Sequence, residues 1–149
     1  MRLESEIKQK HFENVHEKLA VNLHFTSNWL GMKYQKLLKP HGISHQQFNV
    51  LRILKGRFPN PATILLIKER MLDKNSNASR LVDKLVMSGL VHRKQCPLDR
   101  RQVDITITEK GMDLLDILVP KIRKLTEDLL RIPEEVALRL SDTLDEIRN

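Results

Sequence analysis

The sequence contains one cysteine, five glycines and no long hydrophobic run. Because Cys96 is the only thiol, no disulfide can form within the chain. No apolar stretch approaches the roughly 18 residues that a membrane-spanning helix needs. Residues 1–10 are charged and lack the apolar centre of an export signal. We therefore expect a cytoplasmic protein that has no membrane partner.

The residue patterns that carry enzyme chemistry are also missing. The chain has no glycine-rich phosphate loop, no nucleophile elbow and no recognisable set of nucleophile, base and acid. Its six histidines join no cysteine pair or His-Glu cluster with zinc spacing. Pro40 and Gly42 break any helix that would bring His41 and His45 together. We expect no catalytic residues, no metal site and no cofactor.

What the chain does have is positive charge that is unevenly distributed. The 149 residues carry a net charge of +7. Residues 109–149 hold 7 basic and 10 acidic residues, a net charge of −3, so the remaining residues carry +10. Such a split is typical of a surface that binds a polyanion beside a neutral or acidic scaffold, although a solvated basic surface would have the same composition.

The most informative stretch runs from residue 79 to residue 111. Leu81 and Leu85 share one helical face, and Gly89 can take the left-handed conformation that ends a helix. Residues 90–96 form a short extended run. In residues 103–108 apolar and polar side chains alternate, which is the pattern of a half-buried strand. A helix followed by a basic β-hairpin is the working end of a winged helix-turn-helix DNA-binding domain.

The rest of the chain is predicted to be helical. Residues 3–38 are expected to form one long helix that ends at Pro40 and Gly42, and its apolar stripe needs a partner outside a small domain. Further helices are expected over about 44–57, with a Ser44 and Gln47 capping box, and over 63–71, 75–88, 109–130 and 133–147. The cap of the helix near residue 75 is left open among Asp73, Asn75 and Ser76. The predicted fold class is mainly α with a small β-hairpin wing (α+β).

With that order of elements, the chain resembles the MarR family of winged-helix transcription regulators. The resemblance covers nearly all of the chain and is strongest in the motifs SRLVDKL, GLV, DRR and ITEKG between residues 79 and 111. It implies a single domain over residues 1–149, in which residues 43–108 form the DNA-binding lobe. It also implies that residues 1–42 and 109–149 form helical arms that hold a homodimer on a pseudo-palindromic DNA operator. Many such regulators are repressors that a small ligand releases from DNA.

The helix after residue 75 is expected to enter the major groove. Asn and Arg side chains can pair with adenine and guanine edges, and Ser can contact bases or phosphates. Arg101, at the tip of the hairpin, is expected to reach a narrow minor groove, with its guanidinium fixed by Asp99. Arg100 and Lys94 are expected to meet phosphates. The full set of predicted DNA-binding residues is Asn75, Ser76, Asn77, Ser79, Arg80, Lys84, Lys94, Asp99, Arg100 and Arg101.

Candidate effector residues are those that would give an apolar wall with a cation, which suits a small aromatic or anionic ligand. They are Phe25, Trp29, Lys33, His45 and Phe48, although a place in the core is the favoured interpretation of the three aromatic residues Phe25, Trp29 and Phe48. Two alternatives stay open. Cys96, near the basic Arg93 and Lys94, could make the regulator redox-responsive. A winged-helix module that binds protein rather than DNA is the other, and the basic wing argues against it.

Overall fold

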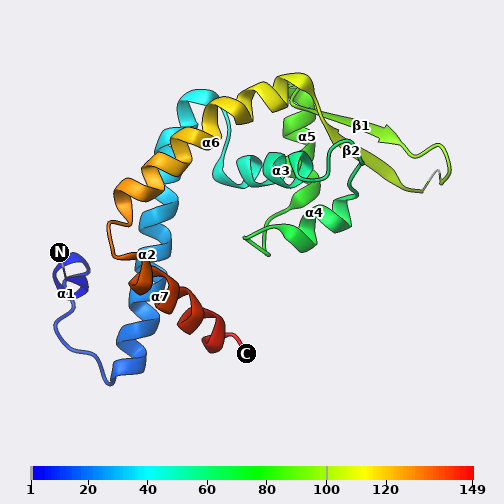
Figure 1. Cartoon of the computed structure of the whole chain (residues 1–149). Helices are drawn as coiled ribbons and strands as arrows, with labels where there is room; N and C mark the ends of the chain where they lie inside the picture. Colours follow the sequence, from blue (N-terminus) through cyan, green and yellow to red (C-terminus); the bar gives the residue numbers. More distant parts are fainter. Residues whose placement is uncertain (1, 100) are drawn as a thin grey trace.

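The computed structural model describes residues 2–99 and 101–149, and it confirms the predicted fold class. In chain order the elements are α1 (Leu3–Glu6), α2 (Val15–Leu38), the 3-10 helix η1 (Lys39–His41), α3 (His45–Lys55), α4 (Ile64–Arg70), α5 (Ala78–Met87), β1 (Val91–Gln95), β2 (Val103–Ile107), α6 (Glu109–Leu129) and α7 (Glu134–Ile147). Figure 1 shows α2 and α6 side by side as a long stem. The lobe of α3, α4, α5 and the β-hairpin lies at one end of this stem, and both termini lie at the other.

The N-terminal segment departs from the single helix predicted over residues 3–38. Only α1 and α2 are helical, and Lys8 between them has a φ of 55°, which a helix cannot accommodate. The side chain of Asn14 then caps α2 by accepting hydrogen bonds from the backbone N–H groups of His16 and Glu17, both at 2.9 Å. The prediction was wrong because the spacing of apolar residues continues across the break between α1 and α2. Asn14, a residue type that caps helices, marks where α2 begins.

Local capping signals elsewhere in the chain act as expected. Ser44 and Gln47 form the predicted capping box of α3. Gly42, with a φ of 73°, ends η1 in the left-handed conformation. The Thr108 side chain caps α6 by accepting the N–H of Gly111 at 3.0 Å. These caps fix where the helices of the lobe begin and end, and thereby which of their faces meet.

Nearly all fully buried side chains belong to one core inside the lobe. The apolar faces of α3, α4 and α5 meet the inner face of the hairpin, and the first turns of α6 close the core from the side. The side chains with zero exposure are Leu38, Val50, Leu51, Ile67, Val82, Leu85, Ile105, Leu115 and Leu118. This core fixes the position of α5 relative to the wing.

The wing is an antiparallel hairpin in which Val91 pairs with Ile107 and Gln95 pairs with Val103. A further bridge joins Ala62 to Ile105, so the segment before α4 also ties into β2. From this anchored base the hairpin extends away from the stem (Figure 1).

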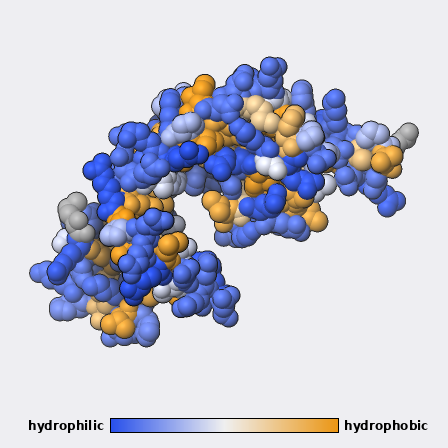
Figure 2. Space-filling view, viewed as in Figure 1, coloured by the Kyte–Doolittle hydropathy of each residue, from blue (hydrophilic) through white to orange (hydrophobic). Residues whose placement is uncertain are grey.

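The C-terminal helices leave much of their apolar surface uncovered. Pro120 lies inside α6, and the helix continues through it to Leu129. Pro133 is the residue before α7 rather than its first residue. No residue of α7 is buried, and Val136, Leu140 and Ile147 are about half exposed. Figure 2 shows hydrophobic surface where α2 and α7 come together. Within the described part of the chain, no helix is both long and apolar enough to span a membrane.

Candidate nucleic-acid interface

Helix α5 is held to the lobe by one face and presents the opposite face to solvent. Ala78, Val82 and Leu85 are buried, as the spacing of their positions requires. Gly89, with a φ of 70°, ends the helix turn as predicted. The predicted contact residues Ser79, Arg80 and Lys84 are therefore exposed.

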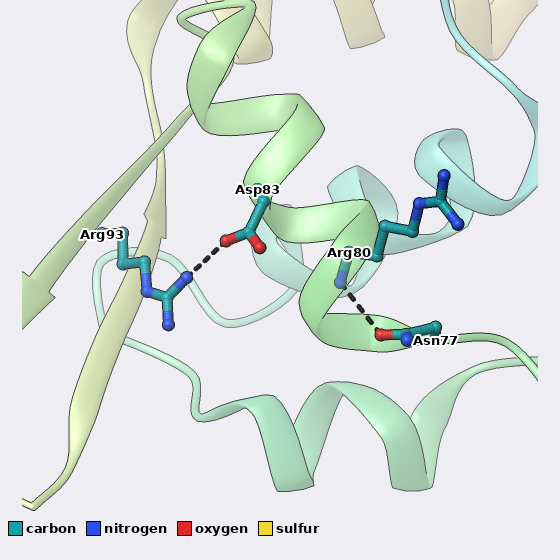
Figure 3. A network of polar contacts seen from close by, with 4 residues as sticks. All are labelled: Asn77, Arg80, Asp83 and Arg93. Atoms are coloured by element: carbon teal, nitrogen blue, oxygen red, sulfur yellow. Dashed lines mark hydrogen bonds and ion pairs between the residues drawn. The ribbon is translucent and has the colours of Figure 1, made fainter.

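The exposed face of α5 has a centre and two flanks. At 100° per residue, Arg80 lies opposite the buried stripe and marks the centre. Asp83 lies on the flank that faces the wing, where it forms an ion pair with Arg93 of β1. Lys84 lies on the other flank, toward α3. Figure 3 shows Asp83 pointing to Arg93, while the side chain of Arg80 extends in the opposite direction.

The N-terminal cap of α5 is Asn77, which corrects the three candidates considered from the sequence. Its Oδ1 accepts the backbone N–H of Arg80 at 3.0 Å (Figure 3). The turn before it is organised by Asp73, whose two oxygens accept the N–H of Asn75 at 3.0 Å and the hydroxyl of Ser76 at 2.9 Å. The cap occupies one acceptor position of the Asn77 amide oxygen and leaves its NH₂ group free of the helix.

The wing presents a second set of exposed polar side chains. Lys94 and Arg101 are exposed, and Asp99 Oδ1 accepts the backbone N–H of Arg101 at 2.9 Å. This hydrogen bond to the backbone shapes the turn. Arg100, also predicted to contact DNA, lies outside the described residues. Cys96 is half-buried, and its N–H donates to the carbonyl of Gln102 at 2.9 Å.

Three contacts that tie α5 and the residues just after it to β1 and to the start of α6 escaped the sequence analysis. One is the Asp83–Arg93 pair. In the others, Lys110 Nζ donates to the carbonyl of Ser88 and the Thr108 hydroxyl donates to the carbonyl of Gly89, both at 2.8 Å. A lone acidic residue on an otherwise basic helix was the only sequence signal for the first pair. Together these contacts tie α5 to strand β1 and its C-terminal end to the start of α6.

The five candidate effector residues fall into different environments. Phe48 is buried in the core of the lobe, whereas Phe25 and Trp29 are half-buried on α2. Lys33 Nζ lies 5.8 Å from the centre of the Trp29 ring, which is a cation–π distance. His45 packs against the Tyr34 ring at 5.2 Å between centroids, and burial lowers the pKa of its imidazole. The structure therefore groups Trp29 with Lys33 and assigns Phe48 to the core.

Two shallow recesses mark the lobe. One, of about 410 Å³, lies between α3 and α5 and is lined by Gln46, Asp73, Ser76, Asn77, Arg80, Leu81 and Lys84. The other, of about 390 Å³, lies where η1, the end of α5 and the start of α6 meet, and is lined by His41, Gly42, Ile43, Ser88, Leu90, Lys110, Asp113, Leu114 and Ile117. The first recess includes four predicted DNA-binding residues together with Gln46, a residue that sequence reasoning did not single out.

Comparison with known proteins places this geometry in context. Residues 43–103 match the model of the MarR family. The chain is 30% identical over 100 residues to the transcriptional regulator MhqR of Bacillus subtilis, covering 67% of this chain and 68% of MhqR. It is 35% identical over 82 residues to the uncharacterized regulator YkoM of the same organism, covering 55% of this chain and about half (52%) of YkoM. The crystal structure of a MarR transcription factor from Planctomyces limnophilus has a TM-score of 0.70 and 26% identity, covering 93% of this chain and 98% of that one.

Proposed function

The chain belongs to the MarR family of DNA-binding transcription regulators, and on that premise we propose that it acts as a homodimeric repressor that binds a pseudo-palindromic operator. The observation that carries the proposal is the outward face of α5, where Arg80 is exposed opposite a fully buried stripe. A helix fixed in this way can enter the major groove with Arg80 toward the base edges.

The wing supplies the second DNA contact in this proposal. Arg101 is exposed at the tip of a hairpin that is anchored to α5 through Asp83 and Arg93. With α5 in the major groove, the tip would lie over the neighbouring minor groove, whose negative potential attracts arginine. Two such lobes in a dimer would meet half-sites about one helical turn (roughly 10 bp) apart, or a multiple of that spacing.

Residues 1–42 and 109–149 are proposed to form the dimer interface, with residues 43–108 as the DNA-binding lobe. The half-exposed apolar residues Val136, Leu140 and Ile147 on α7 support this assignment. Contiguous apolar surface of this kind is rare on a monomer and marks an interaction site. A second copy of the chain would cover it with the same residues, as a two-fold interface requires.

Control by a small aromatic or anionic effector is the third part of the proposal. Proteins of the same fold have been crystallised with 2,4-dichlorophenol and with p-coumaroyl-CoA. In this chain the Trp29–Lys33 pair on α2 offers an aromatic face beside a cation. A ligand that changes how the arms meet the lobe would alter the distance between the two recognition helices.

The DNA-binding part is tested with a fragment from upstream of the protein's own gene. Binding is followed by fluorescence anisotropy across a salt series, for the wild type and for Arg101→Ala. We expect tight, salt-sensitive binding by the wild type, a large loss of affinity in the variant, and dimers of both proteins by light scattering. Weak and equal binding of both proteins, there and on duplexes selected from random DNA, would rule out the proposed role of the wing.

A further inference from the structure

The recess between α3 and α5 brings a side chain of α3 beside the exposed face of α5 and the turn before it. We propose that a backbone phosphate of the operator lies in this recess, held by the side-chain amide of Gln46 together with the ammonium group of Lys84. The inference rests on the proposed DNA-binding function and adds Gln46 to its contact residues. Gln46 and Lys84 come from different helices, and both line the same recess of about 410 Å³.

The polar groups of the recess favour an anion because the Asp73 carboxylate and the Asn77 amide oxygen already accept hydrogen bonds from the backbone and side chains beside them. Both carboxylate oxygens of Asp73 accept hydrogen bonds from the turn before α5. The amide oxygen of Asn77 accepts the N–H of Arg80. The donors that remain are the amide groups of Gln46 and Asn77 and the cations Arg80 and Lys84. With one acid and two cations, the recess carries a net charge of about +1.

The position of the recess on α5 favours a phosphate over a base. An α-helix with its side chains is about as wide as the major groove, so the centre of its outer face meets base edges and its flanks meet the sugar–phosphate walls. Arg80 occupies the centre, and Lys84 lies on the flank toward α3. The opposite flank carries Asp83, whose charge is paired with Arg93. The donor-rich flank is therefore the one that can accept a phosphate.

Gln46 and its neighbour Gln47 differ in their roles, since Gln47 caps α3 and Gln46 faces the recess. Gln47 is buried, and its Oε1 accepts the backbone N–H of Ser44 at 2.8 Å as part of the capping box. Gln46 is exposed and lines the recess. Removal of the Gln46 side chain should therefore affect DNA binding without affecting the fold, whereas removal of Gln47 should destabilise α3.

The test uses the full-length protein and a duplex that the wild type selects from a random pool. Gln46→Ala should weaken binding about tenfold and leave the salt dependence of binding unchanged, because the amide is neutral. Lys84→Gln should weaken binding and lower the salt slope by about one for each subunit. Because both residues hold the same phosphate, the double variant should lose less affinity than the product of the two single losses. Arg52→Gln, an exposed position on α3 that does not line the recess, serves as the control.

Methylphosphonate linkages, which remove the charge of one phosphate at a time, locate the contact. In each half-site one linkage should weaken the wild type and have little effect on the Gln46→Ala, Lys84→Gln double variant. Equal affinity of Gln46→Ala and wild type, losses that multiply in the double variant, or a loss confined to one base sequence would each overturn the inference. If the wild type enriches no duplex at all, the proposed function itself fails.

Discussion

The lobe and the arms differ in how far their apolar side chains are buried. Residues 43–108 contain most of the buried side chains, in a core to which α3, α4, α5 and the hairpin all contribute. In the arms, α2 buries only Leu38 and α7 buries none of its residues. The difference teaches that contacts within one chain are sufficient to cover the apolar residues of the lobe but leave those of α7 and most of α2 exposed or half-buried.

The largest effect should come from removing a core side chain of the lobe. Leu85 is fully buried, so Leu85→Ala should lower the free energy of unfolding by about 2–5 kcal/mol, through lost burial and a residual cavity. Urea unfolding followed by circular dichroism measures the loss, which should be the same at every protein concentration.

Leu140→Ala is the matched change in an arm. Leu140 is 52% exposed within one chain, so the variant should lose stability only through weaker dimerisation. Its unfolding midpoint should therefore be lower at a given protein concentration, and light scattering on a dilution series should show its dimer dissociating at a higher concentration than that of the wild type. A loss as large as that of Leu85→Ala, and independent of concentration, would show that α7 is stabilised within its own chain and would break the comparison.

Two glycines sharpen the comparison, one where the start of α6 packs against the lobe and one on the uncovered part of α2, because the same substitution should have opposite signs at the two places. A Cβ at Gly111 would lie 2.4 Å from the carbonyl oxygen of Leu90 and 2.7 Å from Cγ1 of Ile107. Gly111→Ala should therefore push α6 away from the base of the wing and cost about 1–3 kcal/mol. A Cβ at Gly31, inside α2, meets no atom within 4 Å.

Gly31→Ala should accordingly stabilise the protein by about 0.5–1 kcal/mol, because alanine loses less conformational entropy in a helix. Thermal unfolding of both variants beside the wild type measures the two signs. A destabilised Gly31→Ala would mean that another chain packs closely against α2 at this point, which the size-exclusion profile of the variant would then reveal.

Features of the fold that depend on residues close together in the sequence could be predicted, and features that depend on distant residues could not. The capping box of Ser44 and Gln47, the stop at Gly89 and the strand over residues 103–107 depend on neighbours in sequence, and they were predicted correctly. The cap of α5 was not, because Asp73, Asn75, Ser76 and Asn77 all carry side chains able to cap a helix. Docking of Ala78, Val82 and Leu85 into the core decides among them.

For the candidate site, the exposure of the side chains could be predicted from the sequence, but their pairings could not. The exposure of Arg80 and Lys84 follows from helical periodicity. The pairing of Asp83 with Arg93 and the recess shared by Gln46 and Lys84 depend on how separate elements pack. Sequence patterns report which face of a helix is buried, and they do not report which neighbour lies beside its flanks.

The Asp83–Arg93 pair should affect the free energy of unfolding less than Gly111→Ala or Gly31→Ala does. Both side chains are about half exposed, so solvent and salt screen the pair. A double-mutant cycle with Asp83→Asn and Arg93→Gln should give a coupling of about 0.2–1 kcal/mol that declines at high salt. A larger coupling that does not respond to salt would show that the link between α5 and the wing is a buried element of the lobe.

The smallest effect should come from pH at the junction of arm and lobe. His45 begins α3, and its ring packs against Tyr34 of α2. The backbone N–H of His45 donates to Gln35 Oε1 at 3.0 Å. Burial lowers the pKa of its imidazole from the ordinary value of 6.5, so the unfolded chain binds the proton more readily than the folded one. The stability contributed by neutral His45 is fully present above about pH 6.5 and is lost as the pH falls below it.

Unfolding free energies at a series of pH values from about 8 to about 5 test this, for the wild type and for His45→Gln, which cannot be protonated in this range. The variant should lose less stability than the wild type on acidification. His24→Gln, on an exposed position of α2, controls for the removal of a histidine as such. If the wild type and His45→Gln lose stability in parallel, the contact between α2 and α3 tolerates the charge. The junction would then resemble the loosely covered arms rather than the closed core of the lobe.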